Sequence, residues 1–293
     1  MKITNNFKLP KVVVDALTFD EYSRGASNRS VTQLIDSPRI SLLQRENEEQ
    51  IEQDAVDFLW SRFGTSVHGM FEKSLEDNED QNILSEERLF AEVDGWTISG
   101  AIDLQEITKR GVIISDYKVT SVWSVIYDKQ EWHNQLNVYA WLVRQSKQLK
   151  VKQLRIIAIL RDWQRRKAEE EGDYPQSPIH IVEIPVWNPE ECDEYVRGRV
   201  SLHQEAEYQR ITDNDLVKCS DKERWKKDDT YAVVKSGRKR ALRVLKTKED
   251  AVSYLENSTE KGLMIDIRVG EDTRCVQNWC RVREWCDQFQ AGA

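Results

Sequence analysis

The sequence lacks the long apolar run that a membrane-spanning helix needs. None of its apolar stretches approaches the roughly 20 residues that cross a bilayer as a helix, and 32% of its 293 residues are charged. The first ten residues, Met1–Pro10, lack the apolar core of a secretory signal peptide. Internal repeats and low-complexity tracts are missing as well. We therefore expect a cytoplasmic protein without a membrane partner, long enough to bury one large core or two smaller ones.

The sequence also lacks a net positive charge. Its 43 Lys and Arg residues against 51 Asp and Glu residues give a formal net charge of −8. This balance does not exclude nucleic acid as a partner, because binding depends on local basic patches rather than on total charge. Basic residues gather in two such places, Arg161–Lys167 and Lys235–Lys248.

Two acidic residues and a lysine stand in short apolar runs of the first half of the chain. Gly-Ala-Ile-Asp-Leu contains Asp103, and Ile-Ile-Ser-Asp-Tyr-Lys contains Asp116 and Lys118. Runs rich in Ile and Val between polar turn residues predict strands, and the short polar segment 106–111 predicts a hairpin. Asp116 and Lys118 are two residues apart, so they share one face of a strand. Although strand ends often carry charges without function, two carboxylates and a lysine on one sheet face can bind Mg²⁺ and hold a water beside a phosphate.

Two further patterns flank these strands. Upstream, His68 and Glu72 are four residues apart in a segment with helical spacing, so they share a helix face. Neutral imidazole is a good additional ligand for Mn²⁺, although a lone helical histidine is more often structural. Downstream, Gln135 and Tyr139 share a face of a helix that we expect to begin near Lys129. Gln can hold a phosphate and Tyr can stack on a base, but core packing would also explain this pattern.

In their order and spacing these motifs resemble the PD-(D/E)XK nuclease superfamily, and within it the RecB-like branch. The order is Gly-x-x-x-His, Gly-x-Ile-Asp, Asp-Tyr-Lys and then Gln-x-x-x-Tyr. The likeness is closer still to phage-encoded exonucleases of that branch, whose N-terminal segment is similar to Ser30–Arg39. The resemblance covers nearly the whole chain from about residue 30 onward. It implies an α/β fold with a mixed central sheet flanked by helices.

The resemblance implies a role for each matching residue. The metal ligands would be His68, Asp103, Asp116 and the carbonyl of Tyr117. Lys118 would orient or activate the attacking water, while Gln135 and Tyr139 would contact DNA or brace the site. The family often has a further catalytic Glu on the preceding strand. Glu86 and Glu87 both compete for that place, and we lean to Glu87.

Cysteine placement predicts a second metal centre. The four candidate ligands are Cys219, Cys275, Cys280 and Cys286. In a cytoplasmic chain such a cluster more often binds metal than forms disulfides, and four thiolates can hold a 4Fe–4S cluster or a tetrahedral Zn²⁺. Some RecB-like nucleases hold a 4Fe–4S cluster partly through three C-terminal cysteines.

The match to that cysteine pattern is incomplete. The spacing from Cys280 to Cys286 fits, whereas Cys275 and Cys280 stand farther apart than the usual two-residue gap. The fourth ligand of those relatives precedes the nuclease core, whereas Cys219 follows it. We favour iron–sulfur over zinc, and cysteines without a metal remain an alternative. We expect Cys192 to be a structural helix residue.

A basic hairpin is predicted between these cysteines. Tyr231–Lys235 and Lys239–Val244 would pair around a Ser-Gly-Arg turn. Such a hairpin could clamp a phosphate backbone through Arg238, Lys239 and Arg240, although an ordinary solvated hairpin would look the same.

The coarse organisation follows from these patterns. We expect two domains, a nuclease core at 1–218 and a Cys-containing subdomain at 219–293. The core would begin with an irregular lead-in, 1–30, and a helical stretch, 31–75. Further elements are predicted as strands at 84–118, 154–160 and 179–185 and as helices at 129–147 and 189–210.

Together these expectations describe a Mg²⁺- or Mn²⁺-dependent DNA exonuclease of a phage recombination, repair or replication system, acting in the host cytoplasm. The choice of exonuclease over endonuclease rests on the resemblance alone. A single-strand annealing or single-strand-binding protein would be a fitting partner. Two alternatives stay open: a DNA-binding or recombination-partner protein on a nuclease fold without cleavage, and a Cys-metal interaction module.

Overall fold

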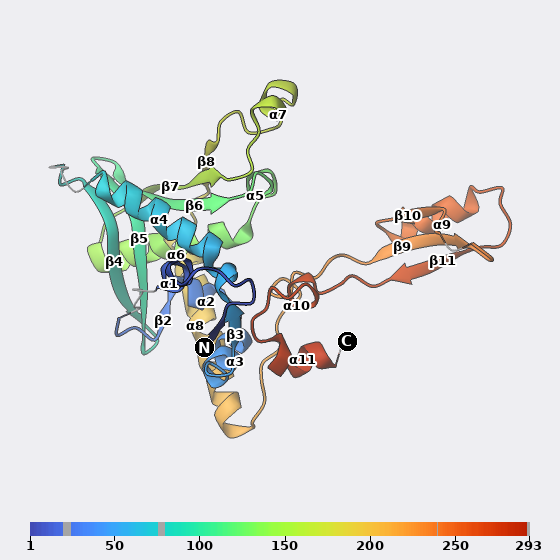
Figure 1. Ribbon diagram of the computed structural model, residues 1–293, viewed down its shortest axis with the longest axis horizontal. Coiled ribbons are helices and arrows are strands. Elements are labelled where there is room, and N and C mark those ends of the chain that lie inside the picture. Colours follow the sequence, from blue (N-terminus) through green and yellow to red (C-terminus); the bar gives the residue numbers. More distant parts are fainter. Residues whose placement is uncertain (20–24, 76–79, 239, 292–293) are drawn as a thin grey trace. The chain divides into compact units, whose positions relative to one another are not determined.

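The computed structural model describes residues 1–19, 25–75, 80–238 and 240–291 (Figure 1). The chain forms two compact units. The first unit comprises Met1–Ser41 and Glu48–Asp215, and the second comprises Leu42–Asn47 and Leu216–Ala293. The division into domains at residue 218 stays a prediction, because compactness alone does not show that either part folds independently.

A six-stranded mixed sheet forms the centre of the first unit. Its strands run in the order β2-β5-β6-β7-β8, with β4 paired to β5. β6 and β7 are parallel, whereas β5–β6 and β7–β8 are antiparallel. The strands are β2 Arg29–Ser30, β4 Ile83–Val93, β5 Trp96–Thr108, β6 Gly111–Thr120, β7 Val151–Leu160 and β8 Ile179–Ile184. This arrangement confirms the predicted α/β class and the hairpin that joins Asp103 to Asp116.

Helices cover both faces of this sheet. Tyr117 of β6 stacks on Phe71 of α4 at a centroid distance of 4.4 Å, while its neighbour Asp116 accepts a hydrogen bond from Gln135 of α6. Because successive strand side chains point to opposite faces, β6 runs between α4 and α6 (Figure 1). The helices are α1 Lys11–Thr18, α2 Val31–Ile35, α3 Pro38–Glu46, α4 Leu59–Lys73, α5 Trp123–Ile126, α6 Gln130–Lys147, α7 Arg165–Glu170 and α8 Pro189–Thr212.

α6 is the most deeply buried helix of the described chain. Its segment Gln135–Val143 is buried without a break, because the sheet lies on one side and α2 and α8 contact the other. Gly100 of β5 permits this close packing: a Cβ there would lie 2.7 Å from Tyr139 Cε1 and 2.9 Å from Leu142 Cδ1. The helix matches the prediction for 129–147, as α8 matches the helix that starts with Pro189.

The N-terminal quarter differs from the prediction. The lead-in contains β1 Lys2–Thr4, α1 and β2, and the stretch 31–75 is interrupted by β3 Glu52–Asp54, which pairs in parallel with β1. A 3₁₀ turn, Ala55–Phe58, then leads into α4. The pairing of β1 with β3 joins segments about 50 residues apart, which local periodicity cannot indicate.

The second unit holds a three-stranded antiparallel sheet in the order β10-β9-β11. Its strands are β9 Thr230–Lys235, β10 Arg243–Leu245 and β11 Leu263–Arg268, and α9 Lys248–Glu256 packs against them. The predicted hairpin is present, but its second strand begins at Arg243 rather than Lys239. The remaining short elements are α10 Thr273–Val276, a 3₁₀ turn Arg283–Trp285 and α11 Asp287–Gln290.

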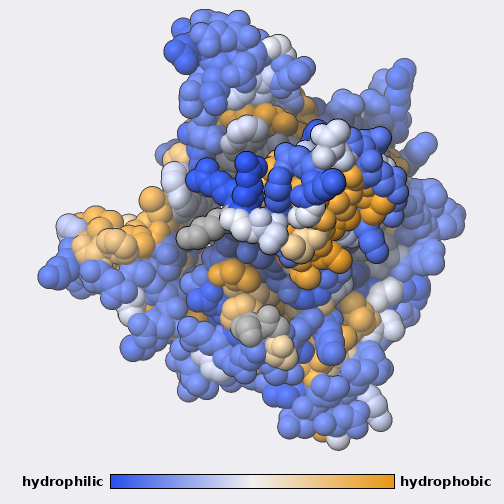
Figure 2. Space-filling model, turned by 90° about the vertical axis from the view of Figure 1, so that its right-hand side faces the viewer, coloured by the Kyte–Doolittle hydropathy of each residue, from blue (hydrophilic) through white to orange (hydrophobic). Residues whose placement is uncertain are grey.

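The visible surface is largely hydrophilic with apolar patches between charged side chains (Figure 2). Within the described residues, no helix is long and apolar enough to cross a membrane.

His203 of α8 makes the stability of the first unit depend on pH. The side chain is buried, and its Nε2 lies 3.1 Å from the carbonyl oxygen of Leu34. Burial, together with the charges of Arg199 and Arg29, lowers the pKa of His203 to about 4. The folded state favours the neutral ring. The ring therefore contributes fully to the free energy of unfolding above the unfolded pKa of about 6.5, and this contribution is lost as pH falls towards 4.

We therefore expect the free energy of unfolding to fall by about 3 kcal/mol between pH 7 and pH 4 on account of this ring. Urea unfolding at several pH values measures the loss. His203→Gln, which cannot be protonated, should flatten this part of the profile. An equally steep profile in the variant would show that other groups cause it.

Candidate metal and catalytic site

The two strands that carry the acidic residues separate at the site. The β5–β6 ladder runs from Thr108↔Gly111 to Leu104↔Ser115, and Asp103 and Asp116 are the next residues on the two strands. A longer β5–β6 ladder would bond the backbone of Tyr117 to β5. Because the ladder ends before Tyr117, its N–H and carbonyl groups bond to side chains instead. Its N–H donates to Asp103 Oδ2 at 2.7 Å, and its carbonyl oxygen lies 3.2 Å from His68 Nε2.

Asp103 and Asp116 are both buried, at 6% and 1% exposure. Burial, and then the nearby charge of Asp116, raise the pKa of Asp103 to about 7. Lys118 Nζ lies 2.6 Å from Asp116 Oδ2. Although burial works to lower the pKa of Lys118, the charges of Asp116 and Asp103 outweigh it and raise that pKa. The site thus holds two close carboxylates with a protonated lysine beside them.

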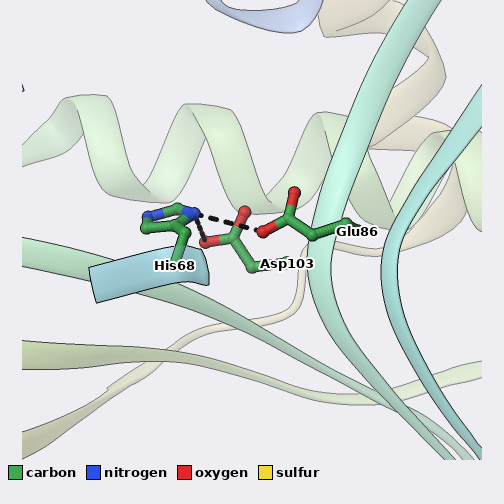
Figure 3. Close-up of side chains that lie close together, drawn as sticks. All are labelled: His68, Glu86 and Asp103. Carbon is green, nitrogen blue, oxygen red and sulfur yellow. Dashed lines mark hydrogen bonds and ion pairs between the residues drawn. The ribbon is translucent and has the colours of Figure 1, made fainter. Parts of the chain in front are cut away.

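His68 and Glu86 complete the group from the neighbouring elements. His68, on α4, places Nδ1 3.2 Å from Glu86 Oε1 and 3.6 Å from Asp103 Oδ2. Figure 3 shows the three side chains pointing towards one another, and their ligand atoms lie within 4.8 Å of one another. Burial lowers the pKa of His68, but the Glu86 hydrogen bond and the charge of Asp103 outweigh it, so that the pKa is raised.

This donor set fits a divalent cation. Carboxylate and carbonyl oxygens with one imidazole nitrogen are ligands that Mg²⁺ and Mn²⁺ accept in proteins. Two buried carboxylates repel each other, and the raised pKa of Asp103 expresses that repulsion. A cation between them would offset it. Asp103, Asp116, His68, Glu86 and the Tyr117 carbonyl are the groups that would hold such an ion.

Glu86 and Glu87, the two candidates for the further acidic residue, have different surroundings. Glu87 accepts a hydrogen bond from Gln105 Nε2 at 2.6 Å and forms an ion pair with Lys147 of α6. Glu86 lies beside His68 instead. Its φ of 49° is left-handed backbone within β4, which disturbs the alternation of side chains that a regular strand would show. Glu86 is therefore the glutamate that lies with His68 and Asp103, and a catalytic role for Glu87 stays a prediction.

Gln135 and Tyr139 lie inside the protein rather than on its surface. Gln135 Nε2 donates to Asp116 Oδ1 at 3.1 Å and to the hydroxyl oxygen of Tyr139 at 3.0 Å. Both side chains are at most 7% exposed. The contacts agree with bracing of Asp116, and contact of the two residues with DNA stays a prediction.

The predicted cysteine cluster lies in the second unit. None of the five cysteines, all in the described part of the chain, forms a disulfide. Burial and then the neighbouring Cys280, with a smaller contribution from Cys286, raise the pKa of Cys275. The Cys219 N–H donates to Gln288 Oε1 at 2.8 Å, and Gln288 Nε2 donates to the Cys219 carbonyl at 3.0 Å.

These contacts hold the Cys219 segment against α11, which begins directly after Cys286. Among the described residues, however, the group with ligand atoms within 4.8 Å of one another is His68, Glu86 and Asp103. The cysteine cluster stays a prediction. Cys192 is buried in α8 and donates through Sγ to the carbonyl of Asn137, as expected of a structural residue.

The basic hairpin residues lie in the connection between β9 and β10. The Arg238 N–H donates to the Lys235 carbonyl at 3.0 Å, and Arg240 is exposed. Lys239 lies outside the described residues. Contact of these residues with DNA stays a prediction.

Comparison with known proteins places this site in a family. The family model of the PD-(D/E)XK nuclease superfamily matches residues 32–287. Among solved structures, SSO0001 is 18% identical with a TM-score of 0.42, over 65% of this chain and 82% of that protein. A protein from Eubacterium rectale, named for a suggested exonuclease activity, is 17% identical with a TM-score of 0.27, over 71% and 76% of the two chains. No curated protein matches. Because the family model spans most of the sequence and includes every residue of the site, the chain belongs to the PD-(D/E)XK nuclease superfamily.

Proposed function

We propose that this protein is a divalent-metal-dependent nuclease that hydrolyses phosphodiester bonds of DNA. The observation that carries the proposal is the assembly of Asp103, Asp116, Glu86 and His68 with Lys118 where β5 and β6 separate. Membership of a nuclease superfamily supports the reaction class. The test is cleavage of DNA with Mg²⁺ or Mn²⁺ against EDTA.

The residues divide the chemistry between them. A bound divalent cation supplies polarisation of the phosphate and a lowered pKa for water. Asp103 and Asp116 neutralise that charge while leaving positions for water and phosphate. The ammonium group of Lys118 orients the attacking water and offsets charge that develops on the phosphate. Gln135 is a positioning residue, because it holds Asp116 Oδ1.

The finer assignments belong to the same proposal. Exonuclease action, the RecB-like branch and a role in phage recombination, repair or replication are supported by the order of the motifs and by the segment Ser30–Arg39. Cleavage would leave a 3′-hydroxyl and a 5′-phosphate. A single-strand annealing or single-strand-binding protein is the partner that such a role would require.

We expect Lys118→Ala to lower the cleavage rate about 100-fold or more, the usual effect of losing a group that stabilises developing charge. Metal binding should change little, because lysine is not a ligand. Single-turnover cleavage measures the first effect and calorimetric titration with Mn²⁺ the second. Lys147→Ala, which removes a lysine that pairs with Glu87 and is not among the proposed site residues, is the matched control. Full activity in Lys118→Ala would refute the role of the lysine.

A 4Fe–4S cluster on Cys219, Cys275, Cys280 and Cys286 is the proposed second cofactor. The short spacing of Cys275, Cys280 and Cys286 along the sequence and the hydrogen bonds that hold Cys219 beside α11 support it. Protein purified without oxygen should contain iron and sulfide, and Cys286→Ser should lose both while Cys192→Ser keeps them. Stoichiometric zinc would replace the iron–sulfur proposal, and protein without either metal would refute a metal centre.

A further inference from the structure

Large aromatic side chains are exposed together where β6 ends. Trp60 and Phe63 of α4 are 53% and 45% exposed, and Trp123 of α5 and the following Tyr127 are 56% and 66% exposed. We name these four residues the aromatic shelf. Single exposed apolar residues need no explanation, but a group of large aromatic side chains at one place marks a binding surface.

Contacts through the β7–β8 connection join the two halves of the aromatic shelf. The guanidinium carbon of Arg161 lies 4.4 Å from the centroid of the Trp60 ring. The Arg161 N–H donates to the Thr120 carbonyl at 3.0 Å, and the Val122 N–H donates to Asp162 Oδ1 at 2.7 Å. The chain beside Trp60 is thus bonded to the residues that precede Trp123. In Figure 1, α5 follows the tip of β6, and α4 begins near the same end of the sheet.

The aromatic shelf and the metal site lie along the same elements of the chain. The strand that carries Asp116 and Lys118 ends at Thr120, about 13 Å from Asp116 at the usual rise per residue. On α4, His68 follows Trp60 by two helical turns, or about 12 Å. α4 therefore carries both shelf residues and a site residue, and β6 leads from the site residues to the helix that carries Trp123.

The geometry of the aromatic shelf suits bases. The Trp123 and Tyr127 rings are nearly parallel, with an interplanar angle of 17° and centroids 6.0 Å apart. Trp60 and Phe63 meet edge to face at 6.3 Å. Arg161, which is exposed and lies over the Trp60 ring, adds positive charge beside the rings, where a nucleic-acid backbone would pass. Stacking platforms with adjacent cations are the means by which proteins hold single strands.

We infer that the aromatic shelf binds unpaired bases of the DNA strand entering the metal site, so that the substrate is single-stranded DNA or a frayed end. The inference rests on the proposed nuclease function and names its substrate. In a duplex the base faces are covered by neighbouring bases, and only an unpaired strand offers them to Trp123 and Tyr127. Cleavage would then follow the strand that the shelf holds.

Binding in Ca²⁺, measured with a fluorescein-labelled oligothymidine and with a hairpin duplex, tests the inference without cleavage. The double variant Trp123→Ala/Tyr127→Ala should bind oligothymidine about 10-fold more weakly or worse, because stacking contributes about 1–3 kcal/mol per base. Duplex binding should change less than about twofold.

Trp279→Ala is the matched control and should bind normally, because it removes a similarly exposed tryptophan, at 64%, from the second unit. Trp123→Phe/Tyr127→Phe, which keeps both rings, should bind nearly as the parent does.

A second assay separates the inference from the proposed function. Hydrolysis of bis(p-nitrophenyl) phosphate needs the metal site but offers no base, so the Ala double variant should hydrolyse it at the parental rate. If that variant bound oligothymidine with parental affinity, the inference about the aromatic shelf would be overturned, but the proposed nuclease function would not be contradicted. An equal loss for duplex and oligothymidine would overturn it too. If the parent hydrolysed neither DNA nor the small ester, the proposed nuclease function would be contradicted. The binding measurement with oligothymidine would still decide the role of the aromatic shelf.

Discussion

Asp116→Asn is expected to lower the rate of DNA cleavage by about a thousandfold or more. The substitution keeps the size of the side chain but removes the charge that faces Lys118 and Gln135 at the centre of the site. Since a metal ion contributes several kcal/mol of charge stabilisation in the transition state, and about 4 kcal/mol corresponds to a thousandfold in rate, loss of this proposed ligand should remove most catalysis. Single-turnover kinetics with Mg²⁺ and with Mn²⁺ measures the effect.

Asp193→Asn provides the matched control for this result. Asp193 lies in the same unit, accepts a hydrogen bond from Trp141 Nε1 and forms an ion pair with Arg197, away from the metal ligands. Cleavage by this variant should stay within about threefold of the parent. Comparable circular dichroism of both variants would show that they are folded. Cleavage by folded Asp116→Asn at the parental rate would contradict the assigned site.

Glu86→Gln and Glu87→Gln are expected to behave differently although the residues are neighbours. Glu86 lies beside His68 with its carboxylate among the ligand atoms, whereas Glu87 pairs with Lys147. Loss of an outer partner of a metal site costs about 10- to 100-fold in metal affinity or activity, and loss of a ligand should cost at least as much. We therefore expect Glu86→Gln to lose 100-fold or more, and Glu87→Gln to stay within about threefold.

Each variant of this pair serves as the control for the other, because the same chemical change is made one residue away. Mn²⁺ titration and cleavage should rank them in the same order. A larger loss in Glu87→Gln would contradict the geometry and restore the preference that the sequence alone favoured.

The parts of the site that could be predicted are those set by local rules. Strand alternation placed Asp116 and Lys118 on one face, and the two lie 2.6 Å apart. The long buried helix with Gln135 also follows from hydrophobic periodicity, whereas the mixed central sheet was implied by the resemblance to the nuclease family. The pairing of His68 with Asp103 could be predicted only through the order of motifs, because no local rule joins residues 35 positions apart.

The parts that were missed depend on backbone irregularity and on contacts distant in sequence. The left-handed φ of Glu86 has no sequence signal, since glutamate rarely adopts it. The pairing of β1 with β3 is non-local. The aromatic shelf could not be predicted, because hydrophobic periodicity does not distinguish an exposed tryptophan from a buried one: Trp60 is 53% exposed, whereas Trp132 and Trp141 are in the core.

Degradation of end-labelled linear and closed circular DNA, with Mg²⁺, Mn²⁺ or EDTA and beside Asp116→Asn, tests the central claim most directly. We predict that the parent degrades linear DNA only with a divalent metal, that circles persist, and that the variant leaves both intact. Cleavage of circular DNA would change the assignment from exonuclease to endonuclease, while the proposed catalytic site would remain the same. Pure, folded protein that cleaves neither DNA with either metal, or that cleaves equally well in EDTA or with Asn at position 116, would contradict a metal-dependent nuclease.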